Sequence, residues 1–131
     1  MTTLVSPDLL YLAFDCYKQK AYSQAAVLFQ LLLVHKPLEL DYWKGLAASL
    51  QGQKDYVKAT QTWMMCSTLD DKQAKFYFYK AQCLYFYSDK RNVASALQEA
   101  KKRCSPDNKM LLSQINKLET HCLGKNKKIK G

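Results

Sequence analysis

The sequence is poor in the residues and patterns that build catalytic and metal sites. It has two histidines, His35 and His121, and it contains neither a glycine-rich phosphate loop nor an H-E-x-x-H motif. Catalysis needs a nucleophile, a base or a metal brought together in one place. His35 ends a predicted helix, where a cation is ordinary, and His121 lacks two further ligands within reach in the sequence. We therefore expect a protein that is not an enzyme and has no metal site or cofactor.

Long apolar runs and paired cysteines are also missing. No apolar stretch approaches the roughly 18 residues that cross a bilayer, and the first ten residues lack the basic and apolar regions of a signal peptide. The five cysteines form no C-x-x-C pair, and their odd number fits neither a disulfide framework nor a zinc site. The sequence predicts a cytoplasmic protein without membrane insertion, in which Cys16, Cys66 and Cys83 are buried thiols inside helices.

The positive charge is distributed unevenly along the chain. Residues 1–100 carry eleven Lys and Arg against nine Asp and Glu, whereas residues 101–131 carry nine against two. The excess at the end lies in short lysine runs without interleaved aromatic residues, so nucleic-acid binding is the weaker interpretation. We predict a solvated, disordered basic tail over residues 124–131, with contact to an anionic partner as the alternative.

A repeating pattern with a period of about 34 residues organises the chain. Trp43, Leu46 and Leu50 fall on one face of a helix, and a second helix with Ala59 and Trp63 follows a polar turn. The same landmarks recur one period earlier and one period later in the chain. A helix–turn–helix repeat of this length with these landmarks is the tetratricopeptide pattern. The sequence therefore predicts three tandem tetratricopeptide repeats.

The predicted fold is all-α, a right-handed solenoid of three helical hairpins with a concave groove and a C-terminal capping helix. Ser6 and Pro7 suit the start of the first helix, and the Ser105-Pro106-Asp107 segment repeats this start signal before the last one. That last helix has an apolar stripe that would cover the open end of the stack. The predicted domain is 1–123, with repeats at about 6–37, 40–71 and 73–104 and the capping helix at about 106–123. The second helix of the first repeat is predicted over about 22–35, and the first helix of the third repeat over 73–87.

A second stripe on the first helix of each repeat is not needed for packing inside the hairpin. It carries aromatic residues in the first and third repeats and smaller or more polar residues in the middle repeat. Such a surface suits an extended peptide, because aromatic side chains provide large contact area at modest entropy cost. Packing on a neighbouring repeat or a second subunit is the alternative. The predicted groove residues are Leu10, Phe14, Tyr17, Lys44, Ala48, Gln51, Phe78, Gln82 and Tyr85.

Three segments of these repeats resemble one family. AFDCY at 13–17, DYWKGLAA at 41–48 and AQCL at 81–84 are similar to the corresponding segments of the tetratricopeptide chaperones of type III secretion that escort translocator proteins. The resemblance covers about residues 9–104. It implies that the groove binds a short extended segment of a hydrophobic translocator and keeps this client soluble in the bacterial cytoplasm until secretion. On this resemblance the groove positions include Leu10, Phe14, Tyr17, Phe78 and Tyr85.

Two questions stay open at the level of sequence. A generic adaptor or scaffold that joins two folded proteins could use the same groove as a chaperone. Co-expression distinguishes the adaptor from the chaperone, because only the client of a chaperone needs this chain to stay soluble. Family members usually carry an N-terminal helical extension implicated in dimerisation, and little of it precedes Ser6 here. The sequence is therefore compatible with both a monomer and a homodimer.

Overall fold

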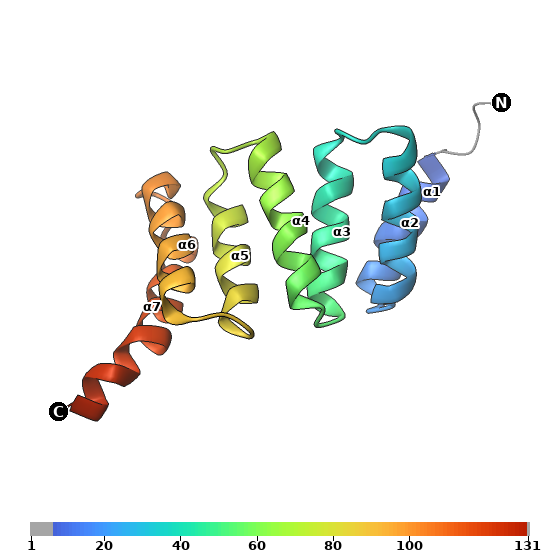
Figure 1. The fold of residues 1–131 in the computed structure, drawn as a ribbon. Helices are drawn as coiled ribbons and strands as arrows, with labels where there is room; N and C mark the ends of the chain where they lie inside the picture. The colour runs from blue at the N-terminus through green and yellow to red at the C-terminus, as the bar shows by residue number, and fades with distance from the viewer. Residues whose placement is uncertain (1–6, 131) are drawn as a thin grey trace.

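The computed structural model describes the backbone of residues 7–130 and the side chains of residues 8–122. In this part of the chain all regular secondary structure is helical, and short turns join the helices into antiparallel hairpins (Figure 1). The predicted all-α fold of three hairpins followed by a C-terminal helix is confirmed. The helices are α1 (Pro7–Lys18), α2 (Tyr22–His35), α3 (Leu40–Gly52), α4 (Tyr56–Leu69), α5 (Ala74–Tyr85), α6 (Lys90–Arg103) and α7 (Lys109–Lys130).

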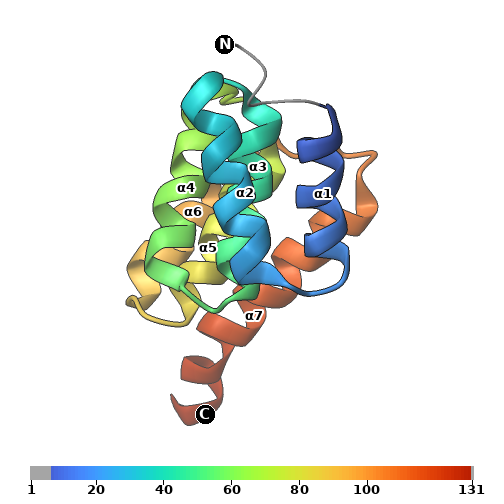
Figure 2. The same ribbon diagram turned by 90° about the vertical axis from the view of Figure 1, so that its right-hand side faces the viewer.

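The three hairpins stack side by side, and each helix up to α6 packs mainly against its neighbours in the chain (Figure 1). α7 packs against both α6 and α5, so it covers the end of the stack. Figure 2 shows α1 and the beginning of α7 on the same side of the molecule, to the right of α2 and α4. Hairpins that contact only their neighbours form a solenoid, and here the first helix of each repeat builds its inner face.

Two clusters of buried side chains hold the stack together. The first joins the first two hairpins around Phe29, Leu32 and Trp63 and reaches into α5, and the second joins the third hairpin to α7 around Leu97 and Ile115. Burying such side chains stabilises a domain by about 1.5–3 kcal/mol for each large apolar residue. The stack thus consists of two packed units that share α5.

The three cysteines that the sequence predicted to be buried belong to the first cluster or pack against it. Cys66 and Cys83 are fully buried, as predicted, and Cys16 is half-buried. Burial raises the pKa of the Cys66 and Cys83 thiols to about 12, because the thiolate would lose its hydration. Both side chains therefore act as small apolar groups at neutral pH.

The turns inside the first two hairpins share one geometry. Lys20 and Lys54 occupy equivalent positions in the first and second repeats, and both adopt positive φ angles, of 63° and 67°. In each case the next residue's N–H donates to the carbonyl five positions earlier, at 2.8 and 3.0 Å, which closes the end of the helix. The third hairpin turns differently: α5 ends at Tyr85, two residues earlier than predicted, and the Ser88 N–H donates to the Leu84 carbonyl at 2.8 Å.

α7 differs from its prediction at both ends. It begins at Lys109 rather than at about 106, because Asn108 caps it, with its Oδ1 accepting from the Leu111 N–H at 3.2 Å. Ser105 instead accepts from the Asp107 N–H at 3.2 Å and shapes the preceding turn. At the other end α7 continues to Lys130, through the stretch 124–130 that the sequence predicted to be disordered. Ser6, the predicted cap of α1, lies outside the described residues.

Candidate peptide-binding groove

A groove of about 670 Å³ crosses the inner face of the stack diagonally. It starts at the C-terminal half of α1, runs along α3 and ends at the N-terminal half of α5. Five of the predicted groove residues line it together, namely Phe14, Tyr17, Lys44, Ala48 and Gln51. The other lining residues are Lys18, Phe29, Asp41, Gly45, Gly52, Trp63, Lys75, Phe76 and Tyr79.

Small residues on α3 make room for the groove. A Cβ atom at Gly45 would lie 2.3 Å from the Phe29 ring, so only glycine lets this ring pack directly under α3. Ala48, one turn further along, adds only a methyl group to the same face. The backbone of α3 therefore forms a low floor between the aromatic side chains of α1 and α5.

Aromatic rings line both ends of this floor. The Phe14 ring meets the Phe29 ring edge-on, with 5.3 Å between centroids, and remains 38% exposed. At the other end Tyr79 lies against Trp63 at 4.7 Å, and Trp63 stacks on Phe76 at 5.9 Å. Offset and edge-on rings of this kind present broad, fairly rigid apolar surfaces. An apolar side chain entering the groove would contact rings on both sides.

A chain of hydrogen bonds ties three helices together at the groove. The Trp63 indole N–H donates to Gln51 Oε1 at 2.9 Å, and Gln51 Nε2 donates to Gln82 Oε1 at 3.1 Å. Indole can only donate, so the contact to Trp63 fixes which way the Gln51 amide points. Gln51 and Gln82 therefore hold α3, α4 and α5 in register at the groove.

Tyr17 combines an apolar contact with a polar end in the groove. Its ring meets that of Tyr22 edge-on at 5.5 Å, and 37% of the residue is exposed to solvent. Partial burial raises the pKa of the Tyr17 phenol, with smaller contributions from Tyr22 and Tyr79. The phenol stays protonated at neutral pH and can donate a hydrogen bond to a carbonyl of a bound peptide.

Four predicted groove residues do not line the groove: Gln82, which bonds to Gln51 beside it, and three residues that lie elsewhere. Phe78 is only 3% exposed and belongs to the buried cluster of the third hairpin and α7, so it is a core residue. Tyr85 packs against α7, with its ring 5.4 Å from that of His121. Leu10 packs against the core of the first two hairpins and does not line the groove. These three residues therefore pack on neighbouring helices, which was the alternative to a place in the groove.

The comparisons with known proteins agree with this geometry. The family model of the tetratricopeptide repeat matches residues 8–34 and 40–72. Low calcium response locus protein H of Yersinia pestis is 32% identical over 77 residues, which are 59% of this chain and 46% of that protein. This chain thus matches about half the length of the curated relative.

Solved structures extend the likeness over most of the chain. The Yersinia enterocolitica type III secretion chaperone SycD, in complex with a peptide of the translocator YopD, is 26% identical and superposes with a TM-score of 0.84, over 91% of this chain and 92% of SycD. The chain contains tetratricopeptide repeats and is similar in sequence and fold to type III secretion chaperones. Pseudomonas aeruginosa PcrH, bound to the chaperone-binding region of PopD, shares the fold at 22% identity, with a TM-score of 0.83 over 94% of this chain and 97% of PcrH.

The groove also has lining residues that the sequence pattern did not indicate. Tyr79 and Lys75 sit on α5 at the positions that correspond, one repeat later, to Gly45 and Asp41 on α3. The predicted stripe followed one set of repeat positions in all three helices. The groove crosses the helices diagonally, so on α5 it uses residues one turn nearer the N-terminus. In the sequence, only the aromatic side chain of Tyr79 could have indicated that this part of α5 lines the groove.

Two structural findings bear on other kinds of site. No helix in the described part of the chain combines the length and the apolar content that a membrane span requires. Within residues 8–122, His, Cys, Asp and Glu side chains do not gather in groups of three that could hold a metal ion. The groove between α1 and α5 is therefore the site on which a functional proposal can be built.

Proposed function

We propose that this protein is a non-enzymatic chaperone that binds an extended segment of a hydrophobic translocator in the groove between α1 and α5. The client stays soluble in the bacterial cytoplasm until it is secreted. The observation that carries the proposal is the aromatic groove itself, on a fold shared with SycD bound to a peptide of the translocator YopD and with PcrH bound to the chaperone-binding regions of PopD and PopB.

The size of the groove suits a peptide segment with a few apolar side chains. Its volume of about 670 Å³ lies in the usual range for ligand sites of about 300–1,000 Å³. An apolar side chain of the peptide that buries about 100 Å² of its surface in the groove contributes about 2.5 kcal/mol to the hydrophobic part of binding, at 25 cal/mol per Å². Covering these side chains removes the exposed apolar surface that drives a membrane-active protein to aggregate. Such binding requires no nucleotide and no bond to be broken.

Co-expression tests this function. The bound protein is identified by mass spectrometry after affinity purification of the full chain from the bacterium that encodes it. We expect this client to be soluble when co-expressed with the wild-type chain and insoluble alone. A Phe14→Ala, Tyr79→Ala double variant should lose the client, whereas Lys58→Ala, on the exposed face of α4, should retain it. A client that is soluble without the chain would favour an adaptor and contradict the chaperone.

We also propose that the protein forms a homodimer through the outer face of α2. Val27, Leu31 and Val34 recur there at helical spacing and are 61%, 41% and 75% exposed. SycD, with the same fold, has been crystallised as an alternative dimer. Light scattering should give twice the chain mass for the wild type and the single-chain mass for Val27→Lys, Val34→Lys. At about 100 µM protein, a dimer whose binding free energy exceeds about 5 kcal/mol would be populated. A wild-type protein that is still monomeric at this concentration would contradict the dimer.

A further inference from the structure

The groove is lined by more positive than negative charge. Lys18, Lys44 and Lys75 come from α1, α3 and α5, and Asp41 is the one acidic side chain among the described lining residues. Asp41 pairs with Lys44 at 3.6 Å. Within residues 8–122 Lys18 and Lys75 have no salt-bridge partner, although the Lys75 ammonium lies 5.9 Å from the Phe76 ring centroid. In the described part of the chain the apolar groove therefore has an uncompensated cation at each end.

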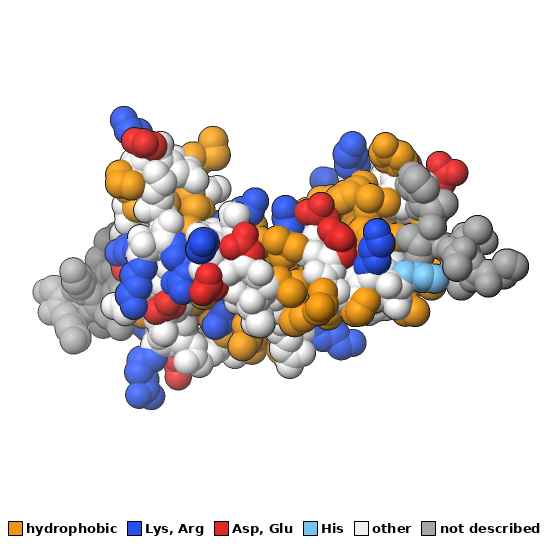
Figure 3. Space-filling model, turned by 90° about the horizontal axis from the view of Figure 1, so that it is seen from above, with side chains coloured by type: hydrophobic (Ala, Val, Ile, Leu, Met, Phe, Trp, Pro, Cys, Tyr) orange, Lys and Arg blue, Asp and Glu red, His pale blue; other side chains and the backbone are white. Residues whose placement is uncertain are grey.

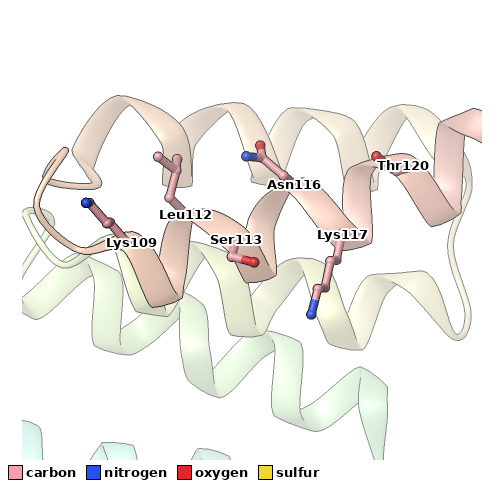
Figure 4. Close-up of a pocket in the computed structure, with 6 residues that line it drawn as sticks. All are labelled: Lys109, Leu112, Ser113, Asn116, Lys117 and Thr120. Carbon is pink, nitrogen blue, oxygen red and sulfur yellow. The ribbon is translucent and has the colours of Figure 1, made fainter.

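α7 repeats this basic character further along the stack. A shallow depression of about 510 Å³ lies on its exposed side, and Figure 4 shows the side chains that line it. Of these described residues two, Lys109 and Lys117, are lysines, and none is acidic. Neither lysine has a salt-bridge partner among the side chains that the structure describes. The remaining lining residues are uncharged: Leu112, Ser113, Asn116 and Thr120.

The repeat period relates this depression to the groove. Lys109 corresponds to Lys75 on α5, and Ser113 corresponds to Tyr79. α7 thus presents a fourth copy of the inner face, on the side of the molecule where α1 also lies (Figure 2). Seen from above, the molecule is hollowed between its two ends, and Lys and Arg side chains lie along this hollow with Asp and Glu side chains beside them (Figure 3). Cations that line a concave surface reinforce each other's potential and attract an anion.

We infer that the client segment of this chaperone is acidic as well as apolar. Its apolar side chains enter the groove, and Asp or Glu side chains that flank them pair with Lys18 and Lys75. Further acidic residues reach Lys109 and Lys117 on α7. This inference rests on the proposed function, because it specifies the chemistry of the segment that the same groove binds. Exposed ion pairs of this kind each change affinity by up to about fivefold and weaken as salt is added.

A selection from random peptides tests the inference before any client has been identified. A phage-displayed library of random 16-residue peptides is selected on the immobilised full chain and sequenced. We expect the selected pool to be enriched in apolar residues and at least about twofold enriched in Asp and Glu. Selected peptides remade with Gln for Glu should bind about tenfold more weakly, as two such pairs would produce. The difference should shrink when NaCl is raised from 50 to 500 mM.

Two matched variants separate the lysines on the inner face from charge in general. The first replaces Lys18, Lys75, Lys109 and Lys117 with Gln, and the second replaces four exposed lysines outside both depressions, at 36, 54, 58 and 72. Only the first should select apolar peptides without acidic enrichment. Circular dichroism and the Tm of both should match the wild type, because all eight side chains lie at the surface.

The outcomes distinguish this inference from the proposed function. Selection of apolar peptides without acidic enrichment on the wild type would overturn the acidic client and leave the chaperone function in place. Enrichment of no peptide at all would overturn both. Displacement of the selected peptides by an equal concentration of a 16-nucleotide oligothymidylate would show that the lysines bind nucleic acid, and the inference would be wrong.

Discussion

The two ends of the stack use the same repeat position in different ways. Tyr17 on α1 and Tyr85 on α5 occupy equivalent positions in the first and third repeats. Tyr17 borders the groove, whereas Tyr85 lies against His121 of α7. The reason is the length of the facing helix. α3 ends at Gly52 and the chain turns back, while α7 continues past residue 120 and covers the end of α5.

The size of the facing side chains adds to this difference. Opposite α1, the helix α3 presents Gly45 and Ala48, which leave space. At the other end of the stack Phe78 of α5 is buried in the cluster that joins the third hairpin to α7. A repeat position therefore predicts which way a side chain points, and the neighbouring helix decides whether that side chain is covered. Substitutions at the two ends and in the turns test this comparison.

The largest effect is expected at Phe78. Phe78→Ala should lower the free energy of unfolding by about 3–5 kcal/mol, the usual cost of removing a buried aromatic ring. Phe14→Ala should lower it by only about 0.5–1.5 kcal/mol, because the main loss is the edge-on contact with Phe29. Urea unfolding of both variants measures the difference. Equal losses would mean that the two ends are covered alike.

The two tyrosines should separate binding from stability. Tyr17→Ala should weaken client binding by about 2 kcal/mol, about thirtyfold, as expected for an aromatic anchor, with little change in Tm. Tyr85→Ala should lower stability by about 1–2 kcal/mol through lost contacts with Phe86 and His121 and leave affinity unchanged. Calorimetric titration with a client peptide and thermal melting measure the two quantities. The comparison fails if Tyr85→Ala is the variant that loses binding.

Gly45→Ala probes the floor of the groove. The new methyl group would press on the buried Phe29 ring, and overpacking of this kind costs about 1–3 kcal/mol. Replacing a helical glycine with alanine also stabilises the helix by about 1 kcal/mol, because alanine has the higher helix propensity. We expect a net loss of about 1–2 kcal/mol in the free energy of unfolding, measured by urea unfolding. A more stable Gly45→Ala variant would show that Phe29 moves aside without cost.

The smallest effect concerns the turns. Lys54→Gly should raise stability by about 0.5–1 kcal/mol, because glycine adopts the positive φ of this position without steric cost. Ser88→Gly, at the corresponding position of the third hairpin, should not, because Ser88 Oγ accepts a hydrogen bond from Asn92 Nδ2 at 2.7 Å. Chemical unfolding of the two variants compares the turns. A gain at both positions would mean that the turns are equivalent after all.

Much of the fold could be predicted from local signals in the sequence. The first residue of α2 follows a turn and its last precedes Pro37, and the predicted bounds of this helix agree with the structure. Local signals failed where two of them competed. Asn108 rather than Ser105 caps α7, because its side chain reaches the Leu111 N–H. Lys109 is then the first helical residue, and Pro106 remains in the turn.

The groove could be predicted only in part. Phe14 and Tyr17 were found from the repeat period, and both line the groove. Trp43 and Trp63 are both landmarks of the repeat pattern. Trp63 is buried, whereas Trp43 is only half-buried, and its indole N–H donates to the Pro37 carbonyl at 2.7 Å. The diagonal course of the groove depends on how each hairpin rotates against the next, which no local pattern encodes.

The sequence by itself determined the helices, their order and the face that each turns inward, because apolar spacing, caps and turns act over a few residues and recur in every repeat. The tertiary structure alone decided which inward-facing side chains remain open to a partner. Phe78 and Tyr85 are covered because α7 packs on α5, and Tyr79 is open because the groove passes over the beginning of α5. Exposure depends on the neighbouring helix, and this contact exists only in the folded stack.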